Sequence, residues 1–238
     1  MLFFKDHSYI SFNLNDFTFS TEILWDIIKV GLPASLSMIV MAVGQGVFNK
    51  ILIHISVETV AAYQVAGRLD MLVFLPIFSI AASLTTLVGM FYGAKEFEAL
   101  RFTIRYGIIS ALIITIFSSA LVYIFADQVV RFFTEDESIV LIAVNFLQIF
   151  AFAYPFIAVG ITTGRVLQGL GKGLPVLVIT IVRVLGVSAP LALFFVFIME
   201  KSVEWVWYSM MLSTVVAFAI GLTWLVSTIK KLPVKKSR

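Results

Sequence analysis

Four polar or polarisable side chains recur along the first long apolar segment of the sequence. They follow one another at spacings of three, four and four residues: Met38, Met41, Gln45 and Asn49. These spacings place all four on one face of a helix. Because an amide that faces lipid is costly, this face should contact protein or a water-filled cavity, and thioethers can adapt to varied apolar ligands. The face is interpreted either as one wall of a substrate cavity or as a set of interhelical hydrogen-bond partners.

A later apolar segment carries a similar set. Asn145, Gln148 and Phe152 fall on roughly one helical face, together with Pro155 and Thr162. We interpret the first three as further candidates for the wall of a substrate cavity.

Three prolines inside apolar segments are hinge candidates: Pro76, Pro155 and Pro190. Proline has no N–H for the preceding turn and tends to bend a helix. Bent helices suit a protein that opens alternately to the two sides of a membrane, although proline is also common in membrane helices in general.

Arg183 is the one charged residue deep inside a predicted membrane span. An ionisable group at such depth is by default a functional candidate, and we include it among the substrate-cavity residues. Snorkelling to the interface or pairing with carbonyls is the alternative. Arg68 and Asp70, in contrast, are interpreted as an interfacial pair.

The sequence lacks the residues that catalysis or metal binding would need. It has no cysteine and only two histidines, His7 and His54, which are far apart. A nucleophile with its base, a pair of buried aspartates or a metal-ligating cluster cannot be drawn from these residues. We therefore expect neither an enzyme nor a metal or cofactor site.

Composition assigns the chain to the all-α membrane proteins. Of its 238 residues 61% are hydrophobic and 13% are charged, whereas a soluble domain is about a quarter charged. The run from Met71 to Tyr92 has no charge and is long enough to cross a hydrocarbon core of about 30 Å. Six transmembrane helices are predicted, at residues 31–55, 71–92, 106–125, 139–164, 174–199 and 203–229.

Three regions follow from this pattern. Residues 1–28 are predicted as a cytoplasmic linker that ends in an amphipathic helix on the membrane surface. Residues 29–230 form the six-helix transmembrane lobe, and residues 231–238 form a basic cytoplasmic tail.

The Lys and Arg residues predict the orientation. Only Arg131 and Lys201 lie in the loops of one side. Twelve lie in the linker, the other loops and the tail: Lys5, Lys29, Lys95, Arg101, Arg105, Arg165, Lys172, Lys230, Lys231, Lys235, Lys236 and Arg238. Since positive loops stay inside, both termini should be cytoplasmic. Basic residues placed between spans also argue for membrane orientation and against nucleic-acid binding.

Several stretches resemble the multidrug and toxic compound extrusion (MATE) transporters. They include IKVGLPASLSMI, VAAYQVAGRLDMLVFLP, LVGMFYGAKEFEALR, RFFTEDESIV and the run from FLQIFAFAYPF to VSAPLALFF. The resemblance is to the C-terminal six-helix lobe, from about Glu22 onward. It implies an integral protein of a prokaryotic plasma membrane. Family members exchange organic cations or other amphipathic compounds for sodium ions or protons, in a cavity between two lobes.

The sequence also departs from the family pattern. Sodium-coupled members carry carboxylates in the first and fourth helices of this lobe, where this chain has apolar residues near Ala42 or Val43 and at Ile157. Met90 replaces a usual Gln, and Gln168 stands where many members have Arg. The coupling sodium ion or proton is therefore expected to bind mainly in a missing N-terminal lobe.

Several functional states are compatible with this resemblance. A half-length transporter could pair with itself as a homodimer or need a separate N-terminal lobe, and its partners would be membrane lipid and a small amphipathic substrate. The alternatives are a lipid-linked oligosaccharide flippase of the same superfamily, which should have a more cationic cavity, and an inactive or scaffolding remnant.

Overall fold

The computed structural model describes residues 19–233, so that part of the predicted linker (1–18) and part of the basic tail (234–238) lie outside the described residues. The described chain is helical almost throughout. Its helices are α1 (Thr21–Ile55), α2 (Val57–Gly93), α3 (Phe97–Arg131), α4 (Glu137–Ala151), α5 (Tyr154–Gly169), a continuous stretch of α6 (Leu174–Ile181), η3 (Val182–Ser188), α7 (Ala189–Leu193) and η4 (Phe194–Ile198), and α8 (Glu204–Lys230).

Short polar residues set several of the helix starts. The Ser20 hydroxyl accepts from the N–H of Ile23 at the start of α1. Ser56 alone separates α1 from α2: its N–H bonds back to Leu52, and its hydroxyl accepts from Thr59. Asp136 caps α4 in the same way, and such side chains satisfy N–H groups that have no partner within the helix.

The spans agree with the predicted class of fold. Within the described residues, five helices are long and apolar enough to cross a membrane, and α4 with α5, bent by 60°, gives a sixth if the bent pair is counted as one span. The chain is thus an all-α, multi-pass integral membrane protein. Its helices extend beyond the predicted apolar cores. In particular α2 begins at Val57 and already contains Arg68 and Asp70, and residues 21–28 form the first turns of α1.

The bend between α4 and α5 has an identifiable cause. Pro155 has no N–H, so the carbonyl of Ala151 lacks its partner four residues ahead. The hydroxyl of Ser119, on α3, donates to that carbonyl. The predicted span at 139–164, in which Pro155 predicted a bend, is therefore two helices that meet at Phe152 and Ala153, with Pro155 in the first turn of the second.

The other two hinge candidates lie in different settings. Pro76 lies inside α2, which remains one continuous helix. Pro190 is in the first turn of α7, between the widened π-helical segments η3 and η4. Widened turns near a proline re-pair carbonyls that the ring leaves without a donor. Whether any of the three prolines acts as a moving hinge stays a prediction.

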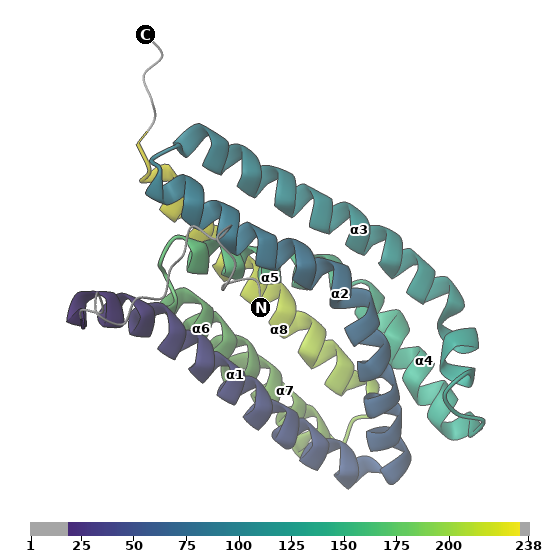
Figure 1. The fold of residues 1–238 in the computed structure, drawn as a ribbon. Coiled ribbons are helices and arrows are strands. Elements are labelled where there is room, and N and C mark those ends of the chain that lie inside the picture. The colour runs from purple at the N-terminus through teal and green to yellow at the C-terminus, as the bar shows by residue number, and fades with distance from the viewer. Residues whose placement is uncertain (1–18, 234–238) are drawn as a thin grey trace.

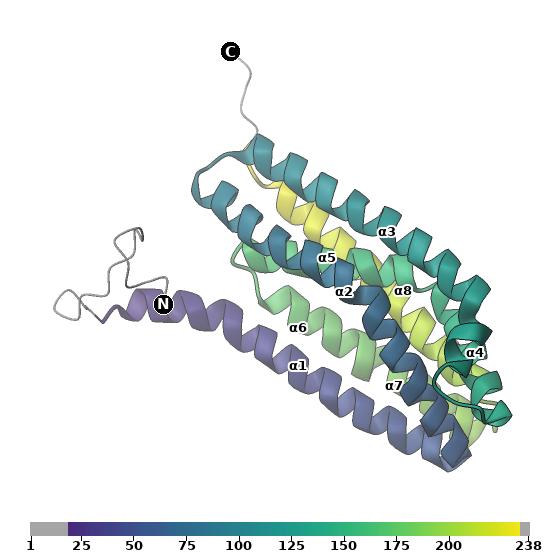
Figure 2. The ribbon, with the colours of Figure 1, turned by 45° about the vertical axis from the view of Figure 1, so that its right-hand side comes forward.

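The helices form two sides that α8 joins. Figures 1 and 2 show α1 running beside the α6–α7 stretch on one side, α2 and α3 lying together on the other, and α8 between them. The largest buried side chains, Trp207, Tyr154 and Phe146, fill the core between these layers. From Ser56 the helices α1 and α2 diverge (Figure 2), and α1 carries many exposed apolar side chains.

The loops predicted to share one side of the membrane do gather at one end of the bundle. The α2–α3 turn, the α5–α6 loop and the end of α8 lie together there (Figure 1). Arg101 of α3 donates to the carbonyls of Leu232 and Pro233, at 3.1 and 3.5 Å. At the other end Arg131 pairs with Asp127 and Glu137, and this guanidinium keeps the pKa of the Glu137 carboxyl below its ordinary value. Which end is cytoplasmic stays a prediction.

Candidate functional site

Arg183 reaches from the η3 segment toward α1. Its Nη2 atom donates to the Met41 sulfur at 2.7 Å. The side chain makes no ion pair with any carboxylate of residues 19–233. Arg183 and Met41, two of the predicted cavity residues, are thus in direct contact at the junction between α1 and the α6–α7 stretch.

The carboxylate of Asp70 has a hydrogen-bond partner in the interior of the bundle, the buried Tyr154. The Tyr154 hydroxyl donates to the Asp70 carboxylate, joining α2 to the first residue of α5. Tyr154 is fully buried, and its ring also meets Phe74 edge-on with centroids 5.3 Å apart. The interpretation of Asp70 as an interfacial partner of Arg68 is wrong, because the carboxylate turns inward to the tyrosine.

Asp70 and Ser119 each form a hydrogen bond to one side of the break between α4 and α5. Ser119 bonds the last residue of α4, Ala151, while Asp70 bonds the first residue of α5. The two contacts come from different helices, α3 and α2. Asp70 and Ser119 therefore contact the two helices on either side of the bend between α4 and α5.

Tyr63 of α2 is part of a buried aromatic cluster. Its ring stacks on Trp207 with centroids 5.9 Å apart, and Phe146 meets both rings edge-on. This aromatic cluster joins α2, α4 and α8, and such edge and stacked pairs resist rearrangement.

The remaining predicted side chains divide between the α1–α2 junction and the outer surface. Asn49 accepts a hydrogen bond from the Gln64 amide at 3.2 Å, so it ties α1 to α2 as the structural alternative expected. Met38 and Gln45 lie on the exposed side of α1, and Met38 is 74% exposed. Phe152 is 65% exposed and packs edge-on against Tyr123 of α3, apart from the others.

The two amides on α4 lie in the partly buried interior. Gln148 is half-buried, and the Asn145 side-chain oxygen is buried without a hydrogen-bond partner among the described residues. Such an unpaired acceptor is costly in an apolar interior, which makes Asn145 available to a donor that enters from outside.

The residues that sequence reasoning missed are Asp70, Tyr154 and Tyr63. The predicted second span began at Met71, one residue after Asp70, because a window without charges excludes any carboxylate. A helix prediction that started from the Ser56 cap would have placed Asp70 inside the helix. No signal in the sequence paired Asp70 with Tyr154, since the two are 84 positions apart.

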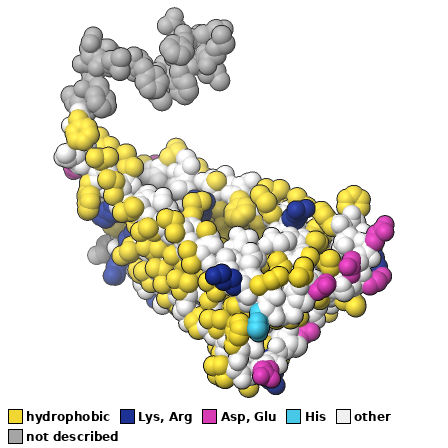
Figure 3. Space-filling view, turned by 90° about the horizontal axis from the view of Figure 1, so that it is seen from below, with side chains coloured by type: hydrophobic (Ala, Val, Ile, Leu, Met, Phe, Trp, Pro, Cys, Tyr) yellow, Lys and Arg dark blue, Asp and Glu magenta, His cyan; other side chains and the backbone are white. Residues whose placement is uncertain are grey.

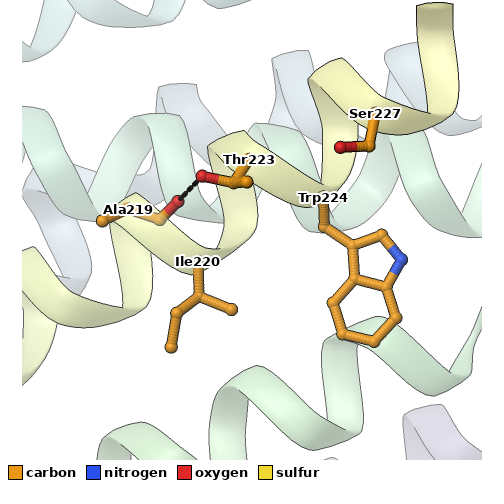
Figure 4. A pocket seen from close by; sticks show the side chains of 5 residues that line it. All are labelled: Ala219, Ile220, Thr223, Trp224 and Ser227. Carbon is orange, nitrogen blue, oxygen red and sulfur yellow. Dashed lines mark hydrogen bonds between the residues drawn. The ribbon is translucent and has the colours of Figure 1, made fainter.

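The surface offers one shallow apolar groove, which is not part of this arrangement. Figure 4 shows it along α8, with Ile220 and Trp224 projecting from the helix. The Thr223 hydroxyl donates to the Ala219 carbonyl one turn earlier in the same helix. No charged residue lines this groove. The face in Figure 3 is largely covered by hydrophobic side chains, with scattered basic groups and with acidic groups gathered toward one end.

Comparisons with known proteins agree on one family. The MatE family model matches residues 33–194. The probable multidrug resistance protein NorM of Thermotoga maritima is 29% identical over 176 residues, which cover 74% of this chain and 37% of that protein. YoeA of Bacillus subtilis, another probable multidrug resistance protein, is 27% identical over 72% of this chain and 37% of its own length.

Solved structures match almost the whole chain. One is a MOP superfamily transporter from Pyrococcus furiosus, for which a binding pocket of reverse polarity suggests a different function; it superposes with a TM-score of 0.90 at 32% identity, over 99% of this chain and 53% of that one. A MATE structure in the straight conformation gives a TM-score of 0.90 at 32% identity, over 97% and 52%. The chain thus spans just over a third of those curated relatives and about half of those solved chains.

Proposed function

Because the chain belongs to the MatE family of transporters, we propose that it forms the C-terminal lobe of a cation-coupled antiporter that exports organic cations or other amphipathic compounds. Membership in a family of transporters supports a transport function and not an enzymatic one. Bacterial relatives likewise support a plasma-membrane location. The second lobe would come from a separate partner or from a second copy of this chain.

The contact between Asp70 and Tyr154 is the observation that supports coupling. A carboxylate in an apolar interior gains from a proton or from a cation, because it is costly to leave it charged and poorly solvated. The hydroxyl of Tyr154 already donates to it. Protonation would turn the carboxyl into a donor, whereas a sodium ion would take the carboxylate and the phenol oxygen as hard oxygen ligands. Either event would change the contact that holds α5 at the bend.

The substrate would bind on the exposed face of α1. Met38, Met41 and Gln45 offer adaptable thioethers and one amide to a small amphipathic molecule. Arg183 is positively charged and is bonded to Met41, so it would repel a cationic substrate there. A cationic substrate would therefore bind nearer to Met38. The coupling ion would then act through Asp70, in addition to any site in the second lobe.

A lipid-linked oligosaccharide flippase is the second candidate, and Arg183 is the observation that favours it. Its guanidinium lies within the bundle without a carboxylate partner among the described residues, as a site for a pyrophosphate would require. Asp70 counts against this candidate, because a carboxylate in the bundle would repel an anionic pyrophosphate.

The test is efflux of tetraphenylphosphonium from proteoliposomes that contain the full chain, driven by an inward sodium or proton gradient. Wild-type protein should transport when one of the two gradients is imposed, and Asp70→Asn should abolish the dependence on that gradient. Asp127→Asn, an exposed aspartate on α3, is the matched control and should transport normally. Transport that is equally gradient-dependent in the Asp70→Asn variant would overturn the role of Asp70.

A further inference from the structure

A small basic pocket lies where α2, α5 and α8 end together. It has a volume of about 160 Å³ and opens to solvent. Two lysines, two hydroxyl-bearing residues and two leucines line it: Lys172, Lys231, Tyr92, Thr228, Leu170 and Leu232. The pocket is distant in sequence from every residue of the candidate coupling site, and no part of the proposed transport function uses it.

The α5–α6 loop that carries Lys172 is held firmly on both sides. A Cβ on Gly169 would lie 2.7 Å from the Thr85 carbonyl oxygen of α2, and one on Gly173 would lie 2.6 Å from the Val30 carbonyl oxygen of α1. Between them Gly171 takes a φ of +76°, which favours glycine. The loop therefore fits closely between two helices and fixes the position of Lys172.

Lys172 and Lys231 retain most of their hydrogen-bonding capacity. The Lys172 ammonium donates to the Thr228 hydroxyl at 3.3 Å, and neither lysine forms an ion pair with a carboxylate of residues 19–233. An ammonium group has three donors, so at least two of those on Lys172 remain for a ligand.

These lysines are not needed to close the helix ends. Lysines near a helix C-terminus often serve its last carbonyls. Here backbone N–H groups already bond carbonyls in the last turns of α2, α5 and α8. Arg101 takes the carbonyls of Leu232 and Pro233 just beyond α8. The two ammonium groups are thus surplus positive charge at this solvent-open pocket.

The depth of the pocket matches a lipid headgroup. Trp224 lies seven residues before Lys231 on α8, which is about 10 Å further into the bundle. Trp and Tyr gather at the level of the headgroups, and basic pockets between membrane helices bind anionic headgroups. Tyr92 lies at the rim and is 43% exposed.

We propose that this pocket binds a phosphate group, and that the phosphate is that of an anionic phospholipid in the surrounding leaflet. Lys172 and Lys231 bind the phosphate oxygens, and the hydroxyl groups of Thr228 and Tyr92 complete the set of donors. A soluble phosphate offers the same oxygens without the acyl chains, so the two sources are distinguishable by competition.

Native mass spectrometry of the full chain in detergent tests this proposal with dioctanoyl phosphatidylglycerol and, as the zwitterionic comparison, dioctanoyl phosphatidylcholine. Wild-type protein should prefer phosphatidylglycerol. The variant Lys172→Gln/Lys231→Gln should bind it more weakly by about fivefold for each lysine lost. The control Arg105→Gln/Lys230→Gln removes the same charge at the same end of the bundle and should bind within about twofold of wild type.

The outcomes separate the possible explanations. Equal weakening in both double variants would overturn the proposal, because it would reflect general surface charge. No preference for phosphatidylglycerol over phosphatidylcholine would overturn it as well. If sodium phosphate displaces the lipid at an equal concentration and constant ionic strength, the phosphate site is supported but the lipid source is overturned, because the acyl chains then add no affinity. Circular dichroism of both variants would establish that a weakened lipid affinity does not reflect unfolding.

Discussion

At the residue scale, Asp70 has the environment expected of a group that binds an ion. Its carboxylate accepts a hydrogen bond from the hydroxyl of the buried Tyr154. Arg183 in turn bonds the sulfur of Met41 and not a carboxylate. Within residues 19–233, Asp70 and Arg183 thus do not neutralise each other by a direct contact.

The contribution of the Tyr154 hydroxyl can be measured by removing it. Tyr154→Phe leaves the Asp70 carboxyl without its donor in a largely apolar setting, so we expect the free energy of unfolding to fall by about 2 kcal/mol. Unfolding titrations in mixed detergent would give this value. Tyr123→Phe is the matched control, because its exposed ring makes no comparable hydroxyl contact among the described residues and the change should cost less than about 0.5 kcal/mol. Equal losses would contradict the importance of the Asp70 contact.

At the element scale, the bend between α4 and α5 reflects a backbone hydrogen bond that is lost and a side-chain hydrogen bond that replaces it. Pro155 removes the N–H that would bond Ala151, and Ser119 provides a hydroxyl to the same carbonyl. The sequence predicted a bend at Pro155 because a proline interrupts helical pairing wherever it occurs. It could not predict Ser119, since the pairing of α3 with α4 depends on tertiary packing that no local pattern encodes.

A double-mutant cycle would test this explanation of the bend. In the wild-type background Ser119→Ala leaves the Ala151 carbonyl unpaired and should cost about 1 to 2 kcal/mol of unfolding free energy. In the Pro155→Ala background the restored N–H can bond that carbonyl, so the same change should cost less. The two costs would be compared by unfolding titrations as a coupling energy. Equal costs in both backgrounds would show that Ser119 does not compensate for the proline.

The α5–α6 loop gives a second element whose geometry depends on contact. Gly173→Ala would place a methyl group 2.6 Å from the Val30 carbonyl oxygen, so α1 or the loop must move, and we expect a loss of about 1 to 3 kcal/mol in unfolding titrations. Gly160→Ala is the control. Gly160 lies inside α5 with open space around it, and the change should be neutral or slightly stabilising. A neutral Gly173→Ala would mean that the loop is not held against α1.

At the scale of the whole molecule, the chain is one membrane lobe in which α1 and α2 diverge from Ser56 (Figure 2). Charge-free runs fixed the number of spans because crossing lipid demands about 20 apolar residues. They did not give the helix lengths, since α2 and α3 continue past their apolar cores into polar turns. The same rule hid Asp70, because a helix that packs inside a protein can hold a carboxylate that lipid would exclude.

The predicted orientation can be tested because the sequence has no cysteine. Glu137 begins α4 at one end of the bundle, and Lys172 lies in the α5–α6 loop at the other (Figure 1). Single cysteines at these positions should react with an impermeant maleimide from opposite sides of the membrane. We expect Lys172→Cys to be labelled from the cytoplasmic side. Labelling of both positions from the same side would contradict the topology.

The most direct test of the central claim is whether ion binding at Asp70 moves α5 relative to α4. Nitroxide labels on cysteines at Ser138 and Arg165, near the outer ends of the two helices, would report their separation by double electron–electron resonance in the full chain in liposomes. The account predicts that sodium or a lowered pH shifts this distance in otherwise wild-type protein and leaves it unchanged with Asp70→Asn. A distance that responds equally in both proteins, or in neither, would contradict coupling through Asp70 and Tyr154.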